Sequence, residues 1–92
     1  MTNVKKIDPA KMWAGKKSQC FFALQNDFNT TEKIFIIRNI KKHLGKDLDE
    51  SDLNAISLEW LLEFLQSIQH SFSMIGFMLN HCIISKIKIQ TQ

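Results

Sequence analysis

This chain has few of the residues that build disulfide-stapled domains or glycine-rich sites: its 92 residues include two cysteines, three glycines, one proline and no tyrosine. Two cysteines are too few for the disulfide framework of a small secreted domain. We therefore expect Cys20 and Cys82 to be buried, reduced thiols that pack as small apolar side chains. The first residues lack the apolar core of a signal peptide, so the sequence predicts a cytoplasmic protein.

Long apolar runs are also missing. The most apolar stretch, Phe72 to Ile84, contains Ser73, Asn80 and His81. As a helix it would be about 20 Å long, shorter than the ~30 Å hydrocarbon core of a bilayer. The sequence therefore predicts no membrane span.

Two segments are similar to phosphate and calcium loops but lack residues that those loops need. The segment ending in Gly15, Lys16, Lys17 and Ser18 has Ala10 where a P-loop has its first glycine. The acidic segment that starts at Asp47 has Asp52 where a calcium loop has glycine, and Leu58 where it has a bidentate glutamate. We expect neither ligand to bind.

The histidines and cysteines do not form a metal or catalytic pattern. His43, His70 and His81 show no paired spacing with Cys20 or Cys82 of the kind found in zinc sites. A cysteine nucleophile would also need a histidine and a third group that orients it. The sequence therefore predicts a non-enzymatic protein with no metal and no cofactor.

Capping residues divide the chain into helical segments. Asp8, Pro9 and Gly15 predict one short helix at the start, whereas residues 18–28 fit either a helix or a buried strand. Asn29 and Glu32 have the spacing of a capping box, and Gly45 is typical of a helix end. Within 29–45 we expect an apolar face formed by Ile34, Ile37, Ile40 and Leu44. A basic face would be formed by Arg38, Lys41 and Lys42.

The second half of the chain predicts a long helix. Asp49 or Ser51 would begin a one-turn helix, and Ser57 would cap the segment that follows. Apolar residues then recur in alternating steps of three and four, which is typical of a helix that packs along its whole length. They are Leu58, Leu61, Leu65, Ile68, Phe72, Ile75, Leu79 and Cys82.

The length of this segment leaves alternatives open. A straight helix of this length would be about 42 Å long, against a diameter of roughly 32 Å for a compact domain of this size. It could break near residues 71–76, reach a partner, or give way to a β-hairpin over 72–90. We predict a single, mostly helical domain over residues 1–92, organised around the C-terminal helix, with a small antiparallel sheet formed by that hairpin as the α+β alternative.

Charges are strongly sorted along the chain, although the formal net charge is only +3. Residues 1–46 hold ten basic and three acidic side chains, whereas residues 47–63 hold six acidic side chains and no basic one. The two segments could neutralise each other by packing. Otherwise the basic segment forms a face that attracts a negative partner.

These features favour a small binding protein. We expect an accessory protein or stoichiometric inhibitor that docks on a larger protein or ribonucleoprotein, as small phage- or plasmid-borne inhibitors of host defence do, anti-CRISPR proteins among them. The alternative is a nucleic-acid-binding regulator that forms a homodimer through Leu58 to Leu79 and contacts phosphates without sequence specificity, since Arg38 is the sole arginine. The expected binding residues are Lys5, Lys6, Lys11, Trp13, Lys16, Lys17, Arg38, Lys41 and Lys42.

Overall fold

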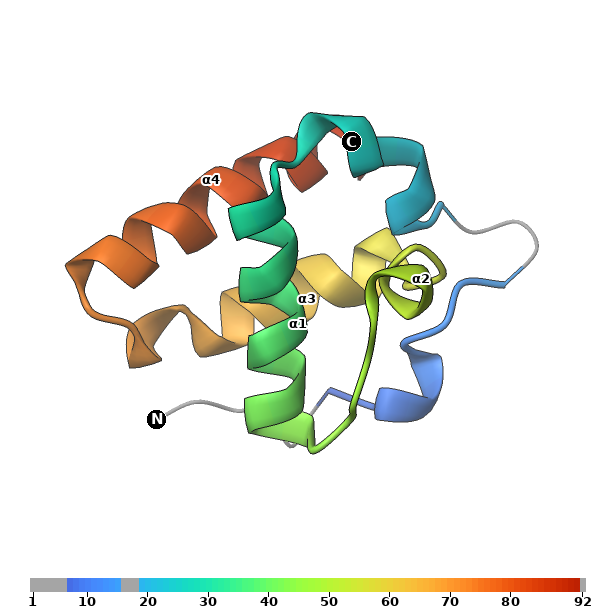
Figure 1. The fold of residues 1–92 in the computed structure, drawn as a ribbon, viewed down its shortest axis with the longest axis horizontal. Coiled ribbons are helices and arrows are strands. Elements are labelled where there is room, and N and C mark those ends of the chain that lie inside the picture. The colour runs from blue at the N-terminus through green and yellow to red at the C-terminus, as the bar shows by residue number, and fades with distance from the viewer. Residues whose placement is uncertain (1–6, 16–18, 92) are drawn as a thin grey trace.

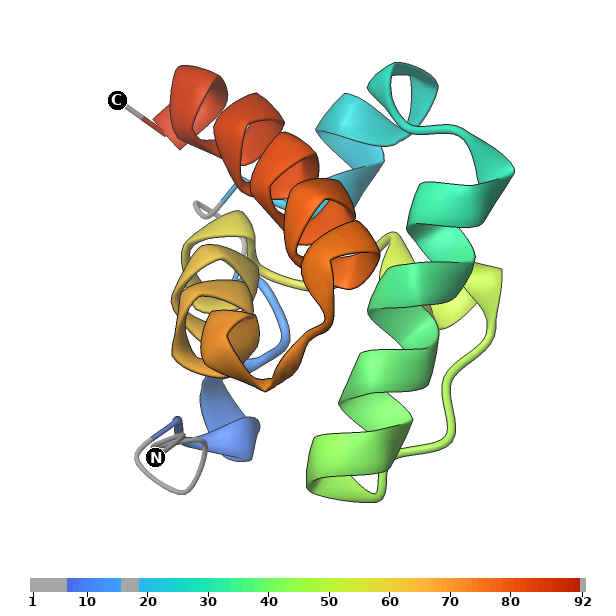
Figure 2. The ribbon, with the colours of Figure 1, turned by 90° about the vertical axis from the view of Figure 1, so that its left-hand side faces the viewer.

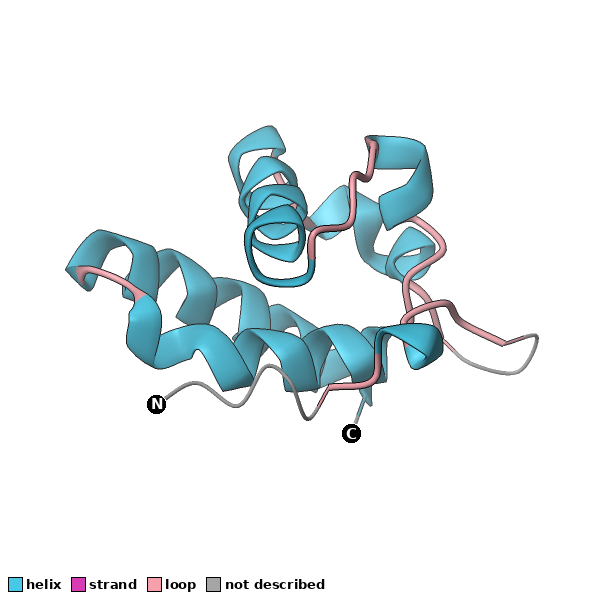
Figure 3. Cartoon of the chain, turned by 90° about the horizontal axis from the view of Figure 1, so that it is seen from below, coloured by secondary structure: helices cyan, strands magenta, loops and turns pink. Residues whose placement is uncertain are grey.

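The protein is mostly helical, as predicted. The computed structural model describes residues 7–15 and 19–91, which have a radius of gyration of 12.0 Å and a longest dimension of 35 Å. The elements are η2 (Pro9–Lys11), η3 (Phe21–Asp27), α1 (Thr30–Leu44), α2 (Glu50–Leu53), α3 (Leu58–Ile68), η4 (Gln69–Ser71) and α4 (Met74–Thr91). Within the described ranges, β-structure is limited to isolated bridges, and no strand is drawn (Figure 3).

Helices α3 and α4 form an antiparallel pair, and α1 crosses α3 at a steep angle (Figures 1 and 2). The predicted long helix breaks at η4, within and just before the region where weak helix propensity indicated a break. One unbroken helix from Leu58 to Thr91 would be about 50 Å long, longer than the whole molecule. The alternative β-hairpin over 72–90 is wrong, because α4 is helical throughout.

Most predicted caps are confirmed. The Asn29 side chain accepts a hydrogen bond from the Glu32 N–H, and the Glu32 carboxylate accepts one from the Asn29 N–H. Gly45 ends α1 with a φ of 71°, a left-handed conformation that glycine adopts without strain. Asp49 caps the one-turn α2, and Ser57 caps α3.

The N-terminal segment is less helical than predicted. The turn capped by Asp8 ends at Lys11, so the expected helix end at Gly15 is wrong. Backbone bonds to the loop before α3 compete with further helix in this segment: the Ala14 N–H donates to the Ala55 carbonyl at 2.9 Å, and the Ser57 N–H donates to the Met12 carbonyl at 2.7 Å. Residues 21–27, which fitted either a helix or a strand, form the 3-10 helix η3.

The core lies where α1, α3, α4 and η3 meet. Six residues of α3 are buried, and Phe64 is fully enclosed, with its ring stacked on Trp60 at 5.1 Å. On α1 the buried apolar side chains are Ile36 and Ile40, whereas Ile34 is 43% exposed. The predicted apolar face of α1 is therefore confirmed at Ile37, Ile40 and Leu44, which are buried or pack against the core, and is wrong at Ile34.

His43 lies at the edge of this core. Burial lowers the pKa of its imidazole below 6.5, and the nearby positive charge of Lys42 lowers it further. Its ring meets Phe64 edge-on at 6.1 Å, and its buried Nε2 has no hydrogen-bond partner among the described residues. In the unfolded chain the His43 imidazole takes up a proton at about pH 6.5, whereas in the folded chain it does so only at lower pH. The contribution of His43 to the stability of the folded state is therefore complete above pH 6.5 and is lost as the pH falls below it.

We therefore expect His43→Gln to lessen the fall in melting temperature between about pH 7.5 and about pH 5.5. His70→Gln is the control, because His70 is exposed. Calorimetry at both pH values measures the effect, and an unchanged fall in the His43 variant would contradict the assignment.

Candidate protein-docking surface

The predicted binding residues that the structure describes do not line one common pocket. Lys5, Lys6, Lys16 and Lys17 lie outside the described residues. Lys11 and Trp13 belong to the N-terminal segment, and Arg38, Lys41 and Lys42 to α1. None of the three pockets that Lys11, Trp13 and Arg38 line is shared by both groups.

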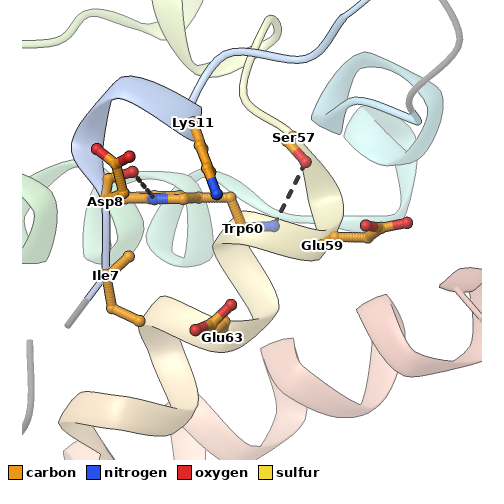
Figure 4. A pocket seen from close by; sticks show the side chains of 7 residues that line it. All are labelled: Ile7, Asp8, Lys11, Ser57, Glu59, Trp60 and Glu63. Atoms are coloured by element: carbon orange, nitrogen blue, oxygen red, sulfur yellow. Dashed lines mark hydrogen bonds between the residues drawn. The ribbon is translucent and has the colours of Figure 1, made fainter.

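Lys11 lies in acidic surroundings. It lines a pocket of about 230 Å³ together with Asp8, Glu59 and Glu63, beside the indole of Trp60 (Figure 4). The Trp60 Nε1–H donates to the Asp8 carbonyl at 3.1 Å, which holds the N-terminal turn against α3. Three carboxylates around one ammonium group disfavour an acidic ligand, so this pocket is a poor docking site for the negative partner that the sequence predicted.

Trp13 is 41% exposed and lines a shallow depression with the segment that follows α1. Its backbone forms an isolated bridge to Ile56. The neighbouring Asp47 and Asp52 again supply negative charge. The backbone bridge fixes the position of Trp13, and its side chain is partly exposed. The side chain can therefore pack on this protein and also contact a partner.

The acidic segment neutralises part of the basic face of α1. Lys33 forms an ion pair with Glu50 at 3.1 Å, and Lys41 forms one with Asp47 at 3.2 Å. Side chains this exposed give each pair a stabilisation of about 0–1 kcal/mol. Among the described residues, no ion pair is formed by Arg38 or Lys42, which lie one turn apart and are exposed.

Arg38 lines a groove between α1 and α4. The groove has a volume of about 370 Å³ and is lined by Thr31, Ile34, Phe35, Arg38, Asn39 and Leu79. The Phe35 ring packs against that of Phe72 at 5.0 Å, so the break between α3 and α4 helps to hold Phe35 in place. Apolar side chains beside an arginine suit a ligand in which an apolar side chain is followed by a carboxylate.

Beside this groove, the first half of α4 exposes large apolar side chains. The exposed fractions are 78% for Met74, 82% for Ile75, 42% for Phe77 and 61% for Met78. The seam predicted from Leu58 to Cys82 therefore faces the core on α3 but not throughout α4, where Ile75 and Cys82 are exposed. The prediction of buried thiols is therefore wrong for Cys82, which is exposed, and Cys20 is only half-buried.

Sequence reasoning missed these exposed residues because it followed one apolar stripe along residues 58–82. The same part of the sequence contains a second apolar stripe, through Met78 and Ile89, so α4 is apolar on more than one side. A helix that is apolar all round needs partners on more than one side. That pattern was the available signal.

No group of three or more potential ligands among the histidine, cysteine, aspartate and glutamate side chains of the described residues could hold a metal ion. No helix in the same part of the chain combines the length and the apolar character needed to cross a bilayer. Comparisons with protein-family models, with curated proteins and with solved structures found no match to this chain.

Proposed function

We propose that this protein is a non-catalytic binding module that docks on a larger protein, as an accessory protein or a stoichiometric inhibitor does. The observation that carries the proposal is the α1–α4 groove, which brings Arg38 together with the apolar side chains of Ile34, Phe35 and Leu79. Arginine is enriched among the residues that dominate binding energy, and its planar guanidinium pairs well with a carboxylate. The partner surface would present an apolar side chain close to an acidic one.

Charge supports a protein partner over a nucleic acid. Two basic groups of the predicted α1 face remain without an ion pair among the described residues, Arg38 and Lys42, since Lys41 contacts Asp47. Non-specific binding to a duplex needs several phosphate contacts at once. The groove floor, formed by Ile34, Phe35 and Leu79, also offers more to an apolar side chain than to a phosphate.

Affinity capture from cells with matched variants tests this function. We expect one protein to co-purify with the wild type at a stoichiometric ratio, and Ile34→Asp or Arg38→Glu to weaken that binding by about 30-fold or more, since each removes a central contact worth roughly 2 kcal/mol. Lys88→Glu makes the same charge change as Arg38→Glu on the exposed side of α4 and should retain the partner.

Circular dichroism and melting temperature establish that each variant is folded. Equal capture by the wild type and both groove variants would contradict docking at this groove. Salt-sensitive binding to an arbitrary duplex, weakened equally by Arg38→Glu and Lys88→Glu, would favour the nucleic-acid regulator instead.

A further inference from the structure

The outer face of α4 forms a second apolar surface that the groove does not use. Asn80, Ile83, Ile84 and Ile87 face the core. On the opposite side, Ile75, Met78, Cys82, Ser85 and Ile89 follow one another in steps of three, four, three and four. All five are exposed, with fractions of 82%, 61% and 72% for Ile75, Met78 and Ile89.

Steps of three and four keep a stripe on one side of a helix and are the repeat of helices that pair by knobs-into-holes packing. A helix of this fold needs one such stripe for its own core, and α4 has that stripe on its inner side. The outer stripe is therefore unexplained by the packing of one copy.

The stripe supplies part of the area that a stable interface needs. Ile75, Met78 and Ile89 together expose on the order of 400 Å² of largely apolar surface, within the range for the largest patch on a monomer. A standard interface buries about 800 Å² on each partner. Side chains that flank the stripe would supply the remainder.

The two ends of the stripe are equally far from its middle residue. Cys82 lies midway between Ile75 and Ile89 in sequence, seven residues from each. If two copies of α4 lie antiparallel across a two-fold axis at Cys82, Ile75 of one copy meets Ile89 of the other, and the small side chains of Cys82 and Ser85 allow the helices to approach closely. A two-fold interface requires this self-complementarity.

Charge favours the antiparallel arrangement of two copies. No acidic residue follows Glu63 in the chain. A parallel pair would place the two copies of Lys88 side by side with no nearby carboxylate on α4, whereas an antiparallel pair keeps them far apart. The antiparallel pair also aligns the helix dipoles favourably.

We propose that this protein forms a two-fold homodimer in which the outer stripes of two α4 helices pack antiparallel around Cys82. The inference is independent of the proposed groove function, because the groove is lined chiefly from α1 and the stripe belongs to α4 alone. The dimer would carry two grooves, one on each copy.

Light scattering over a concentration series tests the assembly. We expect twice the monomer mass for the wild type and monomer mass for Met78→Asp, with a dissociation constant raised at least 100-fold because a carboxylate is buried at the centre of an apolar contact. Phe22→Asp is the matched control, since Phe22 is 60% exposed on η3, and it should remain dimeric.

Disulfide formation tests the register. In a Cys20→Ser background, diamide accepts two electrons and two protons from two Cys82 thiols, and a covalent dimer should form within minutes at low protein concentration. The Cys82→Ser variant, which keeps Cys20, should not form it.

Monomer mass for the wild type up to about 0.5 mM would overturn the inference, as would a dimer that persists in Met78→Asp. If the wild type is monomeric and captures a partner protein that Met78→Asp no longer captures, the stripe is instead the binding surface for that partner.

Discussion

Replacing Phe64 by alanine is expected to lower the free energy of unfolding by about 3–5 kcal/mol, at the upper end of what a single core substitution costs. The Phe64 side chain is fully buried on α3. It stacks on Trp60 at 5.1 Å and receives the edge of His43 at 6.1 Å, so it joins α3 to the end of α1. The cavity left by the ring cannot collapse without moving both elements.

Denaturant unfolding followed by tryptophan fluorescence measures this loss, because Trp60 reports directly on the stack. Domains of this size are stable by about 5–15 kcal/mol, so the variant could lose half of its stability or more. Phe22→Ala is the control, since Phe22 is 60% exposed and should change stability by less than about 0.5 kcal/mol. Equal effects of the two substitutions would show that α3 does not pack as described.

The second large effect is expected at the contact between Glu32 and Lys86, which joins α1 to α4. The Lys86 ammonium lies 2.9 Å from each carboxylate oxygen of Glu32 and 2.8 Å from the Asp27 carbonyl. It also lies 5.1 Å from the centre of the Phe28 ring. The Glu32 side chain is 4% exposed and that of Lys86 is 37% exposed.

Lys86→Met is therefore expected to cost about 2–3 kcal/mol, below the 3–5 kcal/mol of a fully buried pair because solvent reaches Lys86. The cost arises from the carboxylate that remains buried with the Asn29 N–H as its remaining hydrogen bond. Combining Lys86→Met with Glu32→Gln should recover much of this loss, since glutamine keeps the capping box and removes the buried charge.

A double-mutant cycle in urea measures the coupling between the two positions. Lys88→Met is the matched control: it removes a lysine from the exposed side of the same helix and should change stability by less than about 0.5 kcal/mol. Additive effects of Lys86→Met and Glu32→Gln would contradict a direct interaction.

Local signals in the sequence predicted where helices begin and end. The capping box of Asn29 and Glu32, the cap residues Asp49 and Ser57, and Gly45 at the end of α1 all occupy their expected positions. Each of these signals depends on hydrogen bonds or backbone angles within a few residues, so the surrounding fold has little influence on it.

The direction in which each helix faces could not be predicted as well. Isoleucine occupies positions 34, 36, 37 and 40 on α1, so more than one apolar face is consistent with the sequence. Packing against α3 and α4 selected Ile36 and Ile40 and left Ile34 at the groove. The groove itself could not be foreseen, because Leu79 reaches it from a helix distant in sequence.

The fate of the charges also depended on the fold. The sequence showed that basic and acidic residues are segregated, and it left open whether they would meet. Lys33 and Lys41 meet Glu50 and Asp47 because the chain turns back at Gly45, whereas Arg38 lines the groove.

By itself the sequence determined that the chain is mostly helical, at which residues its helices are capped, and that its basic and acidic residues are segregated. These properties depend on residues that are close together in the sequence. Tertiary packing decided which side of α4 enters the core and which side stays in water. A helix with apolar residues on every side can bury any of them, and the inner face was chosen by α3, through contacts such as the 3.0 Å hydrogen bond from the Asn80 amide to the Leu65 carbonyl.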